Sequence, residues 1–184
     1  DGIVAYIQHM NRHLGVANTP IAGRETITPE LDYKPLNYTI DLEVAFQFTE
    51  IHQSMILCFL NSSDAEASGV VMEGFLSALD RTINTYAHQA GLVSHDWYNF
   101  SEDDIICGLT AIISVWHPKP SFEGCTRWKI MNPEVVNPIF DLTCNALRDF
   151  AAQHPNEMRR IIEKCLQTRR GANSGAMADK RLLF

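Results

Sequence analysis

The sequence has no segment that could cross a membrane and no recognisable secretion signal. None of its apolar runs approaches the roughly 20 residues that a transmembrane helix needs. The start, Asp1-Gly2-Ile3, has neither the basic region nor the apolar region of a signal peptide. Because the chain also does not begin with Met, we expect it to be a piece of a longer protein.

Positive charge is scarce. Lys and Arg together number 15 against 22 Asp and Glu, which gives a formal net charge of −7. Domains that bind nucleic acid by bulk electrostatics instead cluster Lys and Arg on one surface. Any contact with DNA would therefore have to be local, or be made by other domains.

Cysteine pairs with metal-ligand spacing are absent. The chain contains five cysteines, an odd number, and no C-x-x-C motif. Its histidines are scattered along the sequence. We predict no metal site, and we expect four of the cysteines to be small core residues in a reducing compartment. The five are Cys58, Cys107, Cys125, Cys144 and Cys165.

The chain does have enough apolar residues for one domain. It contains 184 residues, of which 46% are hydrophobic and 20% charged. Residues 171–184 are small and polar, so we place one domain at 1–170 and a flexible C-terminal tail at 171–184.

Strand patterns occur in three places. Residues 109–116 form an apolar, β-branched run that predicts a strand covered on both faces. Residues 38–48 alternate, which predicts a strand with one buried face, and residues 55–60 are its expected hairpin partner. Residues 17–37 contain four Pro or Gly breakers and no clear period, so we expect them to be mostly loop.

Helical periodicity predicts four longer helices and one short helical turn. The turn follows Ser101, and the helices are expected over residues 1–13, 71–89, from Pro133 to 150, and from Pro155 onward. Helices gathered on one face of a small, mostly antiparallel sheet would make an α+β domain.

A short loop follows the strand at 109–116. Pro118 and Pro120 end that strand, because proline cannot donate to a ladder. Beyond them, Arg127 and Lys129 form a small cationic tip that could meet a phosphate or a carboxylate, although each could equally be a solvated surface cation.

Segments across nearly all of the chain resemble, in the same order, one family domain. This is the transducer, the second domain of the ATPase region of DNA gyrase B and other bacterial type IIA DNA topoisomerases. The similar segments are Asp1-Gly2-Ile3, Asn18-Thr19-Pro20-Ile21, residues 43–48, Phe59-Leu60-Asn61, Gly74-Phe75, residues 81–84, Asp103-Asp104, Gly108-Leu109, and the loop at 122–129, which resembles Phe-x-Gly-Gln-Thr-Lys.

The resemblance implies a fold and a function. The fold is a four-stranded sheet with a left-handed βαβ crossover. The function is to relay ATP-driven closure of a homodimer to DNA strand passage. ATP and Mg²⁺ would be bound mainly by a preceding ATPase domain, so the isolated chain is predicted not to hydrolyse ATP. The further partners implied are a downstream cleavage domain, a gyrase A-type subunit and DNA, all in the cytoplasm.

The resemblance also implies site residues. Arg127 stands where the family has the lysine that reaches the γ-phosphate of ATP, so it is the predicted catalytic residue. Cys125, Thr126, Arg127 and Lys129 are the predicted nucleotide-binding residues. Helices of the family domain line the cavity through which DNA passes, and Arg81 is predicted to face that cavity.

Three departures from the family pattern leave an alternative open. Gln-Thr-Lys is replaced by Cys125-Thr126-Arg127, Gly-Gly-Thr-His by residues 68–71, and a cavity arginine by Leu76. Arginine keeps the charge and can bind phosphate oxygens in a bidentate manner. The alternatives are a divergent, non-catalytic interaction or regulatory module and, less favoured by the net charge, an RNA- or DNA-binding domain. The sequence does not distinguish a supercoiling from a decatenating parent enzyme.

Overall fold

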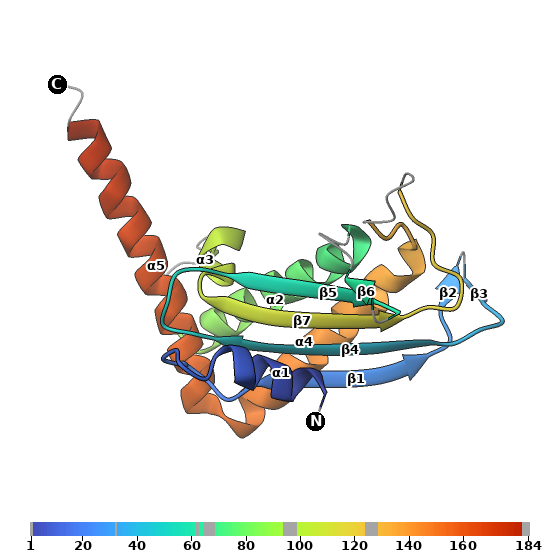
Figure 1. Ribbon diagram of the computed structural model, residues 1–184. Helices are drawn as coiled ribbons and strands as arrows, with labels where there is room; N and C mark the ends of the chain where they lie inside the picture. Colours follow the sequence, from blue (N-terminus) through green and yellow to red (C-terminus); the bar gives the residue numbers. More distant parts are fainter. Residues whose placement is uncertain are drawn as a thin grey trace.

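The computed structural model describes residues 2–31, 33–61, 63–64, 69–93, 99–123 and 129–181, and it shows a mixed sheet with helices packed against it (Figure 1). This is an α+β fold, as predicted. In chain order the elements are α1 (Ile3–Met10), β1 (Ile21–Ile27), β2 (Glu30–Leu31), β3 (Lys34–Pro35), β4 (Ile40–Phe48), β5 (Met55–Leu60), β6 (Ser63–Asp64), α2 (Gly69–Gln89), α3 (Glu102–Ile106), β7 (Leu109–Trp116), the 3₁₀ helix η1 (Pro133–Val135), α4 (Val136–Gln153) and α5 (Pro155–Arg181). Over this part of the chain, no helix is long and apolar enough to span a bilayer.

The main sheet contains four long strands and the two-residue strand β6, in the order β1-β4-β7-β5-β6. The predicted strand at 109–116 is confirmed as β7. The predicted hairpin of 38–48 with 55–60 is wrong, because β7 lies between β4 and β5 and pairs antiparallel with one and parallel with the other. Parallel neighbours need a crossover connection, which the segment containing α2 and α3 provides.

The prediction of loop for residues 17–37 is also wrong. Within it, β1 pairs antiparallel with β4 along its whole length. Gly23, which we counted as a breaker, is instead a point of close packing: a Cβ there would lie 2.9 Å from Leu142 Cδ1 of α4. An ion pair of 3.1 Å between Arg24 and Glu43 joins the two strands.

Helices cover both faces of the sheet, not one. Helices α2, α4 and α5 lie on one side of the sheet (Figure 1). Their apolar side chains pack with one face of β4 and β7 in the main core. On the other face, Ile7 of α1 packs against Ala45 and Ile112. Consequently β4 is buried on both faces from Val44 to Phe48, where the alternation predicted one buried face.

A buried polar chain fixes α1 and the segment after it to the sheet. Thr110 Oγ1 donates to Asn11 Oδ1 at 3.0 Å, and Asn11 Nδ2 donates to Gln47 Oε1 at 2.9 Å. Gln47 Nε2 then donates to the backbone oxygen of Asn18 at 2.7 Å. These bonds let polar residues of β4 and β7 be buried without losing their hydrogen-bond partners.

Two further helical predictions are confirmed. Ser101 and Asp104 form a reciprocal capping box at the start of α3. The Asp104 carboxylate therefore has a structural role at the helix N-terminus. The stripe Met158, Ile161, Ile162 and Cys165 of α5 is buried. The helical backbone of α5 continues to Arg181 and projects beyond the sheet (Figure 1). The division at residue 170 stays a prediction.

We expect alanine at two helical glycines to have opposite effects. A Cβ on Gly74 of α2 would lie 2.5 Å from the backbone oxygen of Val136, so Gly74→Ala should lower the free energy of unfolding by about 1–3 kcal/mol through overpacking. Apart from its chain neighbours and the backbone of its own helix, no atom of the described residues lies within 4 Å of a Cβ on Gly171 of α5. Gly171→Ala should therefore raise the free energy of unfolding by about 0.5–1 kcal/mol through helix propensity.

Urea unfolding of the two variants beside the parent chain measures both effects. A neutral or stabilising Gly74→Ala would contradict the close approach of α2 to α4.

Candidate functional site

The loop after β7 leaves the sheet through a short two-stranded stem. Phe122 and Ile130 form an antiparallel bridge. On either side of it, the Glu123 N–H donates to the Lys129 oxygen and the Met131 N–H to the Ser121 oxygen, each at 3.0 Å. The stem therefore holds residues 121–123 and 129–131 side by side.

Three of the predicted site residues fall, in the sequence, between the two segments of the stem. Cys125, Thr126 and Arg127 lie outside the described residues, so their roles stay predictions. Lys129 is described: its Nζ lies 2.9 Å from Glu123 Oε2, and its side chain is 43% exposed. This surface ion pair lies across the stem and leaves the ammonium accessible.

A buried polar cluster anchors the stem at the end of β7. His117, only 1% exposed, lies with its Nε2 3.3 Å from Glu134 Oε1. The same carboxylate oxygen accepts hydrogen bonds from Asn132 Nδ2 at 2.9 Å and from the Tyr38 hydroxyl at 3.1 Å. Residues from three separate parts of the chain therefore converge on one carboxylate.

Two asparagines satisfy the backbone where the strand becomes a loop. Asn61 accepts from the His117 N–H at 2.7 Å and donates to its carbonyl oxygen at 2.9 Å, as a neighbouring strand would. Asn132 Oδ1 accepts from the Ser121 N–H at 2.6 Å. The path of the loop out of the sheet is thus fixed by side chains.

The charge states in this cluster follow from burial and hydrogen bonding. Burial lowers the pKa of His117, although the Glu134 carboxylate opposes this. Its Nδ1 accepts from the Lys119 N–H at 3.1 Å, which fits a neutral ring with its proton on Nε2. Burial alone would raise the pKa of Glu134, but the donors Asn132 and Tyr38, with His117, lower it below the ordinary value. The cluster is therefore a carboxylate surrounded by neutral donors.

The start of α2 packs against the stem. Gly69 has a φ of +44°, and a Cβ there would lie 2.7 Å from the Ile130 oxygen and 2.8 Å from Lys129 Cγ. Gly69 belongs to residues 68–71, one of the segments that departs from the family pattern. That departure therefore adjoins the loop that carries Arg127.

Arg81 does not belong to this site. It lies twelve residues after the start of α2, which corresponds to about 18 Å along the helix. Its guanidinium lies 5.7 Å from the centre of the Phe140 ring of α4. Together with Arg148 it lines a separate hollow of about 330 Å³ that also contains Thr85, Tyr86 and Gln89.

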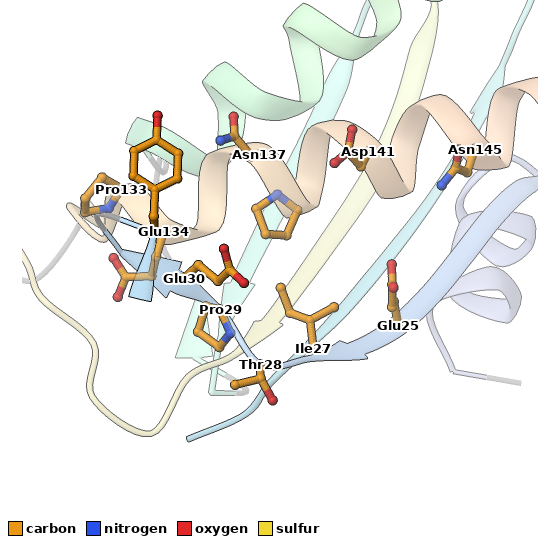
Figure 2. A pocket seen from close by; sticks show the side chains of 12 residues that line it. Glu25, Ile27, Thr28, Pro29, Glu30, Pro133, Glu134, Asn137, Asp141 and Asn145 are labelled. Carbon is orange, nitrogen blue, oxygen red and sulfur yellow. The ribbon is translucent and has the colours of Figure 1, made fainter. Parts of the chain in front are cut away.

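A groove of about 820 Å³ lies between β1 and α4 (Figure 2). Asn137, Asp141 and Asn145 project from successive turns of α4 toward it, and Glu25 and Glu30 line its other side. Among the described residues, its lining includes four carboxylates and no Lys or Arg. A negative groove repels phosphates, so the cationic tip of the loop is the better candidate for meeting a nucleotide.

Sequence reasoning found the loop but missed the residues that hold it. Asn61 lies within a segment quoted for the resemblance, and Asn132 and Glu134 flank Pro133, where the sequence predicts only the start of a helix. The hydrogen bond from Tyr38 to Glu134 joins residues 96 positions apart. No local pattern in the sequence signals such a partnership.

Comparison with protein families gives a match over almost the whole chain. The family model described as DNA gyrase B matches residues 2–180. The B subunit of DNA gyrase from Mycoplasma genitalium is 34% identical over 166 residues, covering 90% of this chain and 26% of that protein. The B subunit from Streptococcus pneumoniae is 36% identical over 164 residues, covering 89% and 24%. The chain thus spans about a quarter of the length of these relatives.

Solved structures share the fold. The 43K ATPase domain of Thermus thermophilus gyrase B, crystallised with an aminocoumarin, superposes with a TM-score of 0.81 at 24% identity, over 97% of this chain and 46% of that one. The B subunit of the Myxococcus xanthus DNA gyrase gives a TM-score of 0.70 at 17% identity, over 89% and 48%. The chain corresponds to just under half of each solved chain.

We expect the buried cluster to make stability depend on pH. Below pH 6.5, the ordinary pKa of histidine, the unfolded chain binds a proton at His117 that the folded chain does not. The free energy of unfolding should therefore fall between about pH 7 and pH 5. His117→Asn, which keeps an oxygen able to accept from Lys119, should be less stable at pH 7 but lose this part of the pH dependence.

Urea unfolding at pH 7, 6 and 5 tests this expectation. The range stays above the pKa of Glu134, so its titration does not contribute. His13→Asn, an exposed substitution, is the matched control and should keep the parent's slope. An unchanged slope in His117→Asn would show that His117 is not the titrating group.

Proposed function

The chain belongs to the DNA gyrase B family, and from this we propose that residues 1–170 are the transducer domain of an ATP-dependent type IIA DNA topoisomerase. Residues 171–184 are a C-terminal tail in this proposal, and its residues 171–181 continue helix α5. ATP and Mg²⁺ are bound mainly by a preceding ATPase domain. The transducer reaches the nucleotide through the loop at 122–129 and passes the closure of the dimer on to the rest of the enzyme.

The observation that carries this proposal is the anchored stem of the loop. A loop that senses a phosphate in another domain must present its cation in a fixed direction, because misplacement weakens a charge-assisted hydrogen bond. The bridge between Phe122 and Ile130, together with the hydrogen bonds around His117 and Glu134, fixes the base of the tip. Arg127 would supply a planar fork for the γ-phosphate oxygens, assisted by Cys125, Thr126 and Lys129.

Strand β7 provides a rigid link from the loop to α5. Its eight residues span about 23 Å, and it is hydrogen-bonded to β4 and β5 on its two sides. At the end away from the loop, Lys164 Nζ of α5 donates to the Ile51 oxygen at 3.2 Å, and Arg169 lies 3.7 Å from Asp104. A displacement of the loop can therefore reach the projecting helix through the sheet.

The remaining parts of the proposal come from the family. The parent enzyme is a cytoplasmic isomerase that forms a homodimer when ATP binds. It contains a downstream cleavage domain and acts with a gyrase A-type subunit on DNA. The left-handedness of the crossover between β5 and β7 is also part of the proposal. The chain by itself is not expected to hydrolyse ATP.

We expect Arg127 to be required for ATP turnover in a domain swap. The chain is placed in a working gyrase B protein in place of its own transducer, and DNA-stimulated ATP hydrolysis is measured. Arg127→Ala should lower kcat about 10³-fold, the lower end of what a transition-state arginine contributes to phosphoryl transfer. Arg127→Lys should retain much of the activity, because it keeps the charge.

The isolated 184-residue chain is the control and should release no phosphate above background. Hydrolysis absent from all versions of a folded, dimerising chimaera would favour the non-catalytic interaction module instead. Equal hydrolysis with and without the Arg127 side chain would remove Arg127 from the site.

We also expect Arg81 and Arg148 to contact a DNA phosphate. The two arginines line one hollow, and neither forms an ion pair with a carboxylate among the described residues. In the same chimaera, Arg81→Ala with Arg148→Ala should weaken DNA binding uniformly across sequences. The slope of log affinity against log salt should fall by about 1 per arginine.

Arg12→Ala, on the segment after α1, is the matched control and should leave the slope unchanged. The same salt dependence in the double variant and the parent would place DNA elsewhere.

A further inference from the structure

A further cavity lies where α5 leaves the body of the domain, at the end of β7 opposite the loop. Its volume is about 610 Å³. One wall comes from the turn after β4 and from the end of α3, and the other wall comes from α5. The lining residues used below are His52, Ser54, Cys107, Gln167 and Thr168.

A thiol and an imidazole meet in this cavity. The Nδ1 of His52 lies 3.2 Å from the Sγ of Cys107. The thiol also lies 3.7 Å from the backbone oxygen of His52, to which it can donate. His52 is exposed, whereas Cys107 is 8% exposed and reaches solvent through the cavity. An imidazole at this distance is a base for the thiol proton.

The other described cysteines lie in the core and do not line this cavity. Cys58, Cys144 and Cys165 are all buried. Burial, with a smaller contribution from the Asp104 carboxylate, raises the pKa of Cys165 to about 12, so this thiol stays protonated. Cys144 accepts a hydrogen bond from Thr82 Oγ1 at 3.3 Å inside the core. These three are internal references for an unreactive thiol.

We propose that Cys107 and His52 form a covalent ligand site for small α,β-unsaturated carbonyl compounds. His52 Nδ1 takes the thiol proton, and the Cys107 thiolate attacks the β-carbon of the ligand. As the carbon–sulfur bond forms, the electron pair of the carbon–carbon double bond moves to the α-carbon, which receives the proton back from the imidazolium. Nothing leaves and no oxidant is consumed.

The cavity suits the polar end of such a ligand. Ser54 and Gln167 supply a hydroxyl and an amide that can donate to a carbonyl oxygen. Thr168 on the same wall already donates to the Lys164 oxygen at 3.1 Å, so it contributes shape more than hydrogen bonding. An adduct would lie between Cys107 and α5, at the junction from which the helix projects.

The test is labelling of the folded chain with N-ethylmaleimide at pH 7, followed by peptide mass spectrometry. Cys125→Ser serves as the background, because that cysteine lies outside the described residues. Cys107 should be modified at least about tenfold faster than Cys58, Cys144 and Cys165. His52→Asn and His52→Gln should each slow the modification of Cys107 by about tenfold.

His9→Asn, on the surface of α1, is the matched control and should label like the background. Cys165 reports folding in every variant, because it is modified only if the core opens. Modification of Cys107 at the same rate without the imidazole, or no faster than Cys165 in the parent, would overturn the proposal.

Discussion

The burial of β7 on both faces is the constraint on which the rest of the structure depends. One face packs into the main core, and on the other Ile112 packs under Ile7 of α1. With β4 antiparallel on one side and β5 parallel on the other, the strand cannot slip by one residue without exchanging its two faces. The register of β7 therefore fixes where the loop begins at one end of the strand. At the other end it fixes where the turn after β4 and helix α3 meet α5.

The cluster at the end of β7 turns that fixed register into a fixed direction for the loop. A buried carboxylate is costly unless donors surround it, and Glu134 has Asn132 and Tyr38 as donors with the His117 ring beside it. Because His117 is neutral, the stem is held mainly by hydrogen bonds and only weakly by charge. Such an anchor depends little on salt, which suits the phosphate-sensing role that we propose for the loop.

Helices and strands with long, uniform sequence patterns were predicted well, but the sequence could not predict which strands pair with one another. Strand β7 was predicted from its unbroken apolar, β-branched run, and helices α2 and α5 were predicted because each keeps the helical period over many residues. Strand β1 was missed because Gly23 indicates a break, although its missing side chain in fact admits Leu142. The parallel pairing of β5 and the place of α1 on the opposite face depend on contacts between distant segments. The loop at 122–129 was predicted from the resemblance. The anchoring roles of Tyr38 and Asn61 could not be predicted, because these residues lie 96 and 56 positions from their hydrogen-bond partners.

An acidic domain can have the proposed role of linking a nucleotide site to a DNA site because its negative and positive side chains lie in different places. The net charge of −7 includes the carboxylates along the groove between β1 and α4, which would repel any phosphate there. Helix α2 runs from beside the stem, where Gly69 adjoins Lys129, to the hollow that Arg81 and Arg148 line. In the proposed function, α2 would contact both the stem of the nucleotide-sensing loop and the hollow lined by arginines, so a displacement at one end of this helix would be passed to the other end.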